Sequence, residues 1–161
     1  MQSSTVPQRK IGQDNVSALG FGLMGMSAFY THGDDPAEAE KKHLEVMTRA
    51  ADLGNTFWDT SDIYGPFTNE ELIGKWFKMT GRRKEIFLAT KFAIFLDPET
   101  KSMKVRGDKE YVKSCIEGSL NPFLAALPTT TKNLAKIGRF FFQRSFGLCK
   151  KSFQVRIFFF W

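Results

Sequence analysis

The sequence is poor in cysteine and contains no long apolar run. Its two cysteines, Cys115 and Cys149, do not have the spacing of metal ligands. No stretch approaches 18 uncharged apolar residues, so no membrane span is predicted. The opening residues, MQSSTVPQRK, are polar and lack the apolar core of a secretory signal peptide. Together these absences predict a reduced, cytoplasmic protein without a metal site.

Acidic residues are absent after residue 120. Residues 121–161 hold seven of the 23 Lys and Arg residues and none of the 17 Asp and Glu residues. The formal net charge of +6 therefore comes from this segment, which also holds nine of the 17 phenylalanines. A chain of 161 residues is long enough for one domain with a substantial core. The composition nevertheless divides it into residues 1–120 and a basic, Phe-rich tail at residues 121–161.

The first part repeats a strand, a loop and a helix. Short apolar strands are predicted at 19–22, 56–59 and 86–91, and a hairpin is predicted at 8–18 before them. Because the strands alternate with helices, they are expected to be parallel neighbours in an α/β sheet. Either an open doubly wound sheet or a closed eight-stranded barrel fits this pattern.

Local signals mark where the helices begin and end. Asp35 is predicted as the N-cap of the first helix, with Pro36 at its first position. Thr68 to Glu71 fit a capping box at the start of the second helix, and Gly81 is expected to end it. Asp108 is the predicted cap of the third helix.

Gly20, Gly22 and Gly25 match the G-x-G-x-x-G pattern of dinucleotide-binding folds. That pattern works where the glycine turn opens directly into a helix whose N-terminus receives the pyrophosphate. Here the next predicted helix begins only at Pro36. The glycines are therefore interpreted as part of an ordinary loop between a strand and a helix.

Three ionisable residues stand where strands are predicted to end. Asp59 ends the second strand, Tyr64 lies five residues later, and Lys91 ends the third strand. In a parallel barrel, the carboxyl ends of the strands share the face on which active sites form. We therefore expect these three side chains to cluster.

Such a trio suits the reduction of a carbonyl group. A hydride arriving at the carbon leaves an alkoxide, so the oxygen needs a proton donor. An ordinary tyrosine has a pKa of about 10, but an ammonium about 4 Å away favours the phenolate by about 4 kcal/mol at an effective dielectric constant of about 20. Each residue alone also has a common structural role, as a loop cap, a packing ring or a solvated lysine. The residues alone leave both interpretations open.

Several segments resemble the opening of aldo-keto reductases: LGFGLMGMSAFY, LGNTFWDTSDIYGPFTNEELIGKWFK and RRKEIFLATKF. The resemblance runs from about Arg9 to Leu120, and the blocks DTSDIYG, NEELIG and ATK are its most specific parts. It implies an incomplete (β/α)8 TIM barrel in this chain, made of an N-terminal hairpin and about three βα units. It also implies an oxidoreductase that reduces aldehydes or ketones with NADPH and without a metal.

The resemblance assigns roles to particular residues. Tyr64 is the proton donor, Lys91 is the cation that activates it, and Asp59 anchors Lys91. Gly22, Leu23 and Met24 fall where the family's first βα loop approaches the cofactor, and Asp59 is also assigned to cofactor binding.

The family's fourth catalytic residue, a histidine at the end of the fourth strand, has no counterpart. The chain contains only His32 and His43, both before Lys91, and neither is expected to replace it. The later strands, which supply most contacts to NADPH in the family, are also missing after Leu120.

Three interpretations of the tail remain open. It could be a translated intron or frameshifted exon, a basic aromatic segment that binds a partner, membrane surface or nucleic acid, or a cover for the open sheet edge. The loss of acids, the end of the resemblance and the runs Phe140–Phe142 and Phe158–Phe160 favour the first. We therefore expect an irregular tail that adds no strand beside 86–91, and a truncated chain that does not reduce carbonyls by itself. Nucleic-acid binding is not expected, and the oligomeric state stays open.

Overall fold

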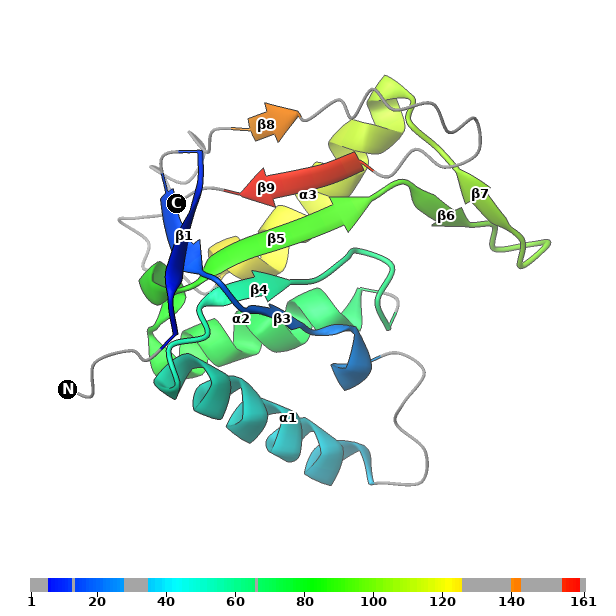
Figure 1. The fold of residues 1–161 in the computed structure, drawn as a ribbon. Helices are drawn as coiled ribbons and strands as arrows, with labels where there is room; N and C mark the ends of the chain where they lie inside the picture. The colour runs from blue at the N-terminus through cyan, green and yellow to red at the C-terminus, as the bar shows by residue number, and fades with distance from the viewer. Residues whose placement is uncertain are drawn as a thin grey trace.

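The computed structural model describes residues 6–12, 14–27, 35–65, 67–125, 140–142 and 155–159. Its centre is a five-stranded sheet with the strand order β3-β4-β5-β9-β8 (Figure 1). The first three of these strands are parallel neighbours, with Gly22 opposite Asp59 and Asp59 opposite Ala89. They are β3 (Gly20–Gly22), β4 (Phe57–Asp59) and β5 (Phe87–Phe92). The three parallel strands expected from the sequence are therefore confirmed.

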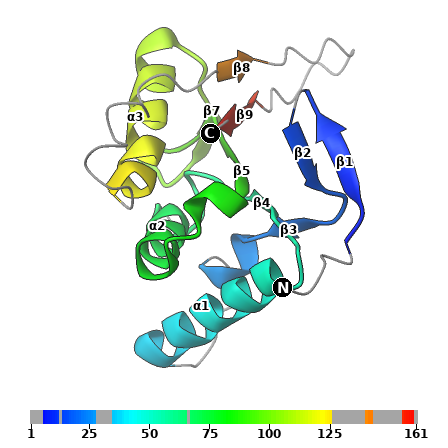
Figure 2. The same cartoon turned by 90° about the vertical axis from the view of Figure 1, so that its left-hand side faces the viewer.

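Three α-helices cover one face of this sheet, as the side view in Figure 2 shows. They are α1 (Pro36–Asp52), α2 (Thr68–Thr80) and α3 (Lys109–Ala125). The helix that was predicted to begin after Asp108 therefore extends beyond residue 120.

Most of the predicted helix signals are confirmed. The Asp35 carboxylate accepts a hydrogen bond from the Glu38 N–H at 3.2 Å, which satisfies one of the free donors at the start of α1. The Asp108 carboxylate accepts from the Tyr111 N–H at 3.1 Å at the start of α3. Gly81 ends α2 with a φ of 70°, a left-handed conformation that glycine adopts without steric cost.

The predicted capping box at the start of α2 is wrong. Thr68 is the first helical residue, and the N-cap is Phe67, which has a φ of 68° and makes no side-chain cap bond. The Thr68 hydroxyl donates instead to the Gly65 carbonyl in the preceding turn. Because the Thr68 hydroxyl is hydrogen-bonded within this turn, the Thr68 side chain does not cap the helix.

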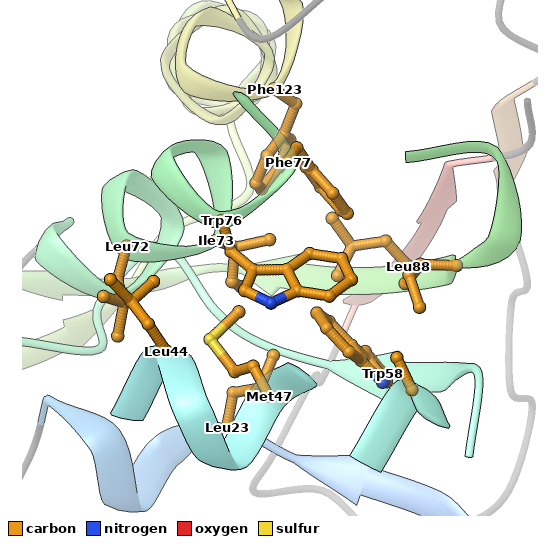
Figure 3. Close-up of a cluster of buried hydrophobic side chains, with 12 residues drawn as sticks. Leu23, Leu44, Met47, Trp58, Leu72, Ile73, Trp76, Phe77, Leu88 and Phe123 are labelled. Carbon is orange, nitrogen blue, oxygen red and sulfur yellow. The ribbon is translucent and has the colours of Figure 1, made fainter. Parts of the chain in front are cut away.

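The main core lies between the sheet and the helices (Figure 3). Trp58 of β4 packs against Trp76 of α2, with ring centroids 4.7 Å apart, and all of Trp58, Trp76 and Phe77 are fully buried. Side chains of a strand alternate between its two faces. Asp59, the residue after Trp58, is therefore carried on the face of the sheet away from the helices.

Two hairpins flank the sheet. The first, β1 (Gln8–Ile11) with β2 (Asp14–Ser17), confirms the predicted N-terminal hairpin. The second was not predicted and joins β6 (Ile94–Leu96) to β7 (Met103–Val105). Its base is closed by a hydrogen bond from the Arg106 N–H to the Ala93 carbonyl at 2.9 Å. The described residues also include two short 3-10 helices, η1 (Met24–Met26) and η2 (Arg83–Glu85).

The tail departs from the expectation that it adds no strand. Its strands are β8 (Phe140–Phe142) and β9 (Val155–Phe159), and β9 pairs antiparallel with β5. An unpaired strand edge presents free N–H and C=O groups, and four of the five residues of β9 are β-branched or aromatic and have high strand propensity. The observed pairing is the one expected if the tail covers the open edge of the sheet. Among the described residues, no helix is long and apolar enough to cross a membrane.

Candidate active site

Asp59 and Lys91 form an ion pair across the carboxyl ends of β4 and β5. Lys91 Nζ lies 2.7 Å from Asp59 Oδ1 and 2.8 Å from the Thr60 carbonyl oxygen. The register explains the contact, since Asp59 is opposite Ala89 and Lys91 lies two residues further along β5 on the same face. The Lys91 side chain is 20% exposed and that of Asp59 is 46% exposed. The pair is therefore open to solvent and to a ligand from this face of the sheet.

Tyr64 lies over the same lysine. Lys91 Nζ is 4.6 Å from the centroid of the Tyr64 ring, within the range of a cation–π contact. The Tyr64 N–H donates to the Ser61 carbonyl at 3.2 Å, which holds the tyrosine in the turn after β4. The structure thus brings together the three residues that were predicted to cluster.

The loop between Asp59 and Tyr64 is anchored along β5. The Thr60 N–H donates to the Ala89 carbonyl at 2.9 Å, and the Asp62 N–H donates to the Lys91 carbonyl at 3.1 Å. The Ser61 hydroxyl donates to that same Lys91 carbonyl at 3.0 Å. The backbone on which Lys91 stands is therefore fixed by two bonds from this loop.

The predicted cofactor-facing residues differ in accessibility. Gly22 is exposed at the end of β3, and a Cβ placed on it would meet no atom within 4 Å. Met24 is half-buried, whereas the Leu23 side chain is completely buried in the core. The Leu23 N–H bonds to the Asp59 carbonyl at 2.9 Å and its own carbonyl accepts from Asn69 at 2.8 Å. Leu23 is thus a core residue, and the open surface of this loop belongs to its neighbours.

The glycine pattern has the context expected of a loop rather than of a dinucleotide fingerprint. η1 follows β3 directly, and the first α-helix begins only at Pro36. Residues 28–34, which include His32, lie outside the described residues. His43 is half-buried within α1. Within the described ranges, no group of three or more His, Cys, Asp or Glu side chains could hold a metal ion.

A buried polar layer behind the site was missed at the sequence level. Asn69 and Glu70 at the start of α2 are 0% and 1% exposed, and Asp62 is 3% exposed. Burial raises the pKa of Glu70 to about 7, and the nearby Asp62 acts in the same direction, while hydrogen bonds from Thr90 and Ser119 oppose it. Burial also raises the pKa of Asp62. Asn69 and Glu70 belong to the segment NEELIG, which is part of the family resemblance. Polar residues in the first turn of a helix are usually interpreted as capping residues, so the sequence did not indicate that these two are buried.

Relatives with curated names match about 72% of the chain. An aldo-keto reductase of Schizosaccharomyces pombe, yakc, whose name specifies NADP(+), is 52% identical over 116 residues, which are 72% of this chain and 33% of that protein. The aldo-keto reductase str7 of Strobilurus tenacellus is 45% identical over 120 residues, with coverages of 71% and 32%. The chain therefore spans about a third of the length of these relatives.

Solved structures agree with the fold. An aldo-keto reductase from Bacillus halodurans in its holo form superposes with a TM-score of 0.60 at 32% identity, covering 73% of this chain and 36% of its own. The glycerol dehydrogenase of Gluconobacter oxydans gives a TM-score of 0.56 at 24% identity, covering 76% of this chain and 36% of its own, which supports the fold alone. The fold is part of a TIM barrel, as predicted. Since the family pattern for aldo/keto reductases also matches residues 18–124, the chain belongs to the aldo/keto reductase family.

Proposed function

We propose that this chain carries the proton-transfer half of a carbonyl reductase site, which reduces an aldehyde or ketone to an alcohol with NADPH. The observation that carries the proposal is the contact of Lys91 with the Asp59 carboxylate on one side and with the Tyr64 ring on the other. All three stand at the carboxyl ends of adjacent parallel strands or in the loop after them, where barrel enzymes build their sites.

In this mechanism the Tyr64 hydroxyl donates a proton to the carbonyl oxygen of the substrate. The positive charge of Lys91 lies over the ring and stabilises the negative charge that this transfer leaves on Tyr64. Asp59 holds the ammonium group in place at 2.7 Å. A nicotinamide cofactor, when bound, would supply a hydride for the carbonyl carbon, and the proton from Tyr64 would complete the conversion of C=O to CH–OH.

The residues at the ends of β3 and β4 fit the approach of this cofactor. Gly22 leaves open space beside the strand end, and the half-exposed Asp59 carboxylate offers a hydrogen-bond acceptor there. Gly22, Met24 and Asp59 would hold the cofactor near the site. The name of the yeast relative supports NADP(H) as the cofactor.

The chain spans about a third of the length of these relatives. Whether it catalyses the reaction by itself is therefore a different question from which of its residues form the site. We propose that residues 1–120 supply the site residues and that the tail at 121–161 is a distinct segment. We also propose that the protein is cytoplasmic and that this 161-residue chain is truncated with respect to an active reductase.

A chimera tests the proposed roles. Residues 1–120 are joined to the remaining two thirds of the Schizosaccharomyces pombe relative, and the oxidation of NADPH is followed with a reactive aldehyde. We expect turnover in the chimera, and Tyr64→Phe is expected to lower kcat by about 100-fold or more because the proton donor is lost.

Tyr111→Phe is the matched control, because Tyr111 lies on α3 and its hydroxyl donates to the Ile94 carbonyl at 3.4 Å. This variant should keep the kcat of the parent chimera. Turnover that survives Tyr64→Phe would show that another group donates the proton, and the proposed roles would then be wrong.

A further inference from the structure

Two polar residues at the start of α2 are buried behind the site. Asn69 is 0% exposed and Glu70 is 1% exposed. Burying an amide or a carboxyl group is unfavourable unless its polar atoms find partners. Those partners lie on the three strands and loops that carry the site residues.

Asn69 connects β4 to the loop after β3. Its Oδ1 accepts from the Thr60 hydroxyl at 2.6 Å, and its Nδ2 donates to the Leu23 carbonyl at 2.8 Å and to the Ser27 hydroxyl at 2.6 Å. Thr60 follows Asp59 directly, and its own carbonyl accepts from Lys91 Nζ at 2.8 Å. A continuous chain of hydrogen bonds therefore runs from the loop after β3 through Asn69 and Thr60 to Lys91.

Glu70 makes the corresponding connection to β5. Its Oε1 accepts from the Thr90 hydroxyl at 2.7 Å, and Thr90 is the residue before Lys91. Adjacent residues of one helix thus hold the strand positions next to both members of the ion pair.

We propose that Asn69 and Glu70 are positioning residues that align the ends of β3, β4 and β5 and so hold Lys91 against Asp59 and Tyr64. The inference rests on the proposed function for its meaning, since it concerns the geometry of that same site. The two side chains act through Thr60 and Thr90 and contact neither the substrate nor the cofactor.

The test removes single hydroxyl groups at constant side-chain shape in the full 161-residue chain. Thr60→Val deletes the bond to Asn69, and Thr90→Val deletes the bond to Glu70. Thr48→Val is the matched control, because the Thr48 hydroxyl accepts from the Trp76 indole N–H at 2.9 Å between α1 and α2, away from the strand ends. Asn69→Ala is the stronger variant, and the valine variants decide the question if it does not fold.

Two measurements report on the position of Lys91 and of the strand ends around it. The first is the ¹⁵N and ¹³C resonance of the Lys91 ammonium and its ε carbon, which responds to the contacts with Asp59 and Tyr64. The second is amide hydrogen exchange at Leu23, Thr60 and Asp62, whose N–H groups bond to Asp59, Ala89 and Lys91. We expect Thr60→Val and Thr90→Val to shift the Lys91 resonances and to reduce protection at these amides by about 10-fold relative to core amides.

Thr60→Ser and Thr90→Ser restore a hydroxyl and should restore both readouts, whereas Thr48→Val should leave the Lys91 resonances unchanged. The proposal would be overturned if the valine variants kept the Lys91 resonances of the parent chain and lost amide protection only in proportion to their loss of global stability. Neither measurement needs a cofactor or turnover. An inactive chimera with altered Lys91 resonances would therefore reject the proposed function and support the positioning role.

Discussion

Lys91 lies over the face of the Tyr64 ring, with its ammonium nitrogen 4.6 Å from the ring centroid. The contact depends on the ring and not on the hydroxyl group. Tyr64→Phe therefore keeps a surface on which the ammonium rests, while it removes the only ionisable atom of the side chain. This makes the phenylalanine variant a selective probe of proton transfer.

The 161-residue chain by itself should show no measurable NADPH-dependent reduction of simple aldehydes. It spans about a third of its relatives, and correct positioning of a hydride donor against a carbonyl accounts for about 7–11 kcal/mol of a barrier. Loss of a proton-transfer histidine would cost a further factor of about 10²–10⁴. The assay follows NADPH absorbance with a reactive aldehyde. Clear turnover in the parent chain that disappears in Tyr64→Phe would contradict this prediction and would mean that the tail or a partner completes the site.

Lys91→Met should separate activity from stability. Because both members of the ion pair are partly exposed, its loss should change the free energy of unfolding by no more than about 1 kcal/mol. The same change in the chimera should abolish most of kcat. Urea denaturation of the chain and steady-state kinetics of the chimera measure the two effects.

Lys75→Met is the control for this prediction, since Lys75 forms an exposed ion pair with Glu40 between α2 and α1. It should have a similarly small effect on stability and none on kcat. Equal losses of kcat in both variants would remove the special role assigned to Lys91.

Glu70 should make folding less favourable as the pH rises. Burial raises its pKa in the folded protein to about 7 from the ordinary value of 4.5. Between these values the folded chain retains a proton that the unfolded chain releases, so the free energy of unfolding falls with rising pH and levels off above about 7. Glu70→Gln should remove this fall, which is at most about 3 kcal/mol, while it keeps an acceptor for Thr90.

Urea denaturation at pH 5, 6, 7 and 8 measures the effect, with Glu71→Gln as the control. Glu71 is the exposed neighbour on the same helix turn and should leave the pH profile unchanged. A Glu70→Gln profile parallel to that of the parent chain would show that Glu70 is not the group responsible.

Gly74→Ala should destabilise the packing of α2 against α3. A Cβ at Gly74 would lie 2.6 Å from the Pro122 carbonyl oxygen, so the two helices must separate. We expect a loss of about 1–3 kcal/mol, as for other overpacked interiors. Gly118→Ala on α3 is the control, because its Cβ meets no atom within 4 Å and alanine favours the helix by about 1 kcal/mol. Thermal unfolding should therefore shift in opposite directions for the two variants.

Short-range chemistry determined much of the fold. Several helix ends depend only on contacts within four residues, so the sequence was sufficient to place them. They are the starts of α1 at Asp35 and Pro36 and of α3 at Asp108, and the end of α2 at Gly81. The parallel neighbours followed from the repeating pattern of strands and helices. Once these strands were adjacent, the ends that carry Asp59 and Lys91 had to meet.

Tertiary structure decided what depends on distant atoms. No nearby residue indicates that Asn69 joins Leu23 to Thr60, or that the tail strand β9 pairs with β5. The sequence likewise does not indicate that the Lys91 ammonium lies over the face of the Tyr64 ring. The physical reason is that a buried polar group or an unpaired strand edge needs a hydrogen-bond partner, and that partner is whichever group lies next to it in the folded chain. The spacing of residues in the sequence does not show which group this is.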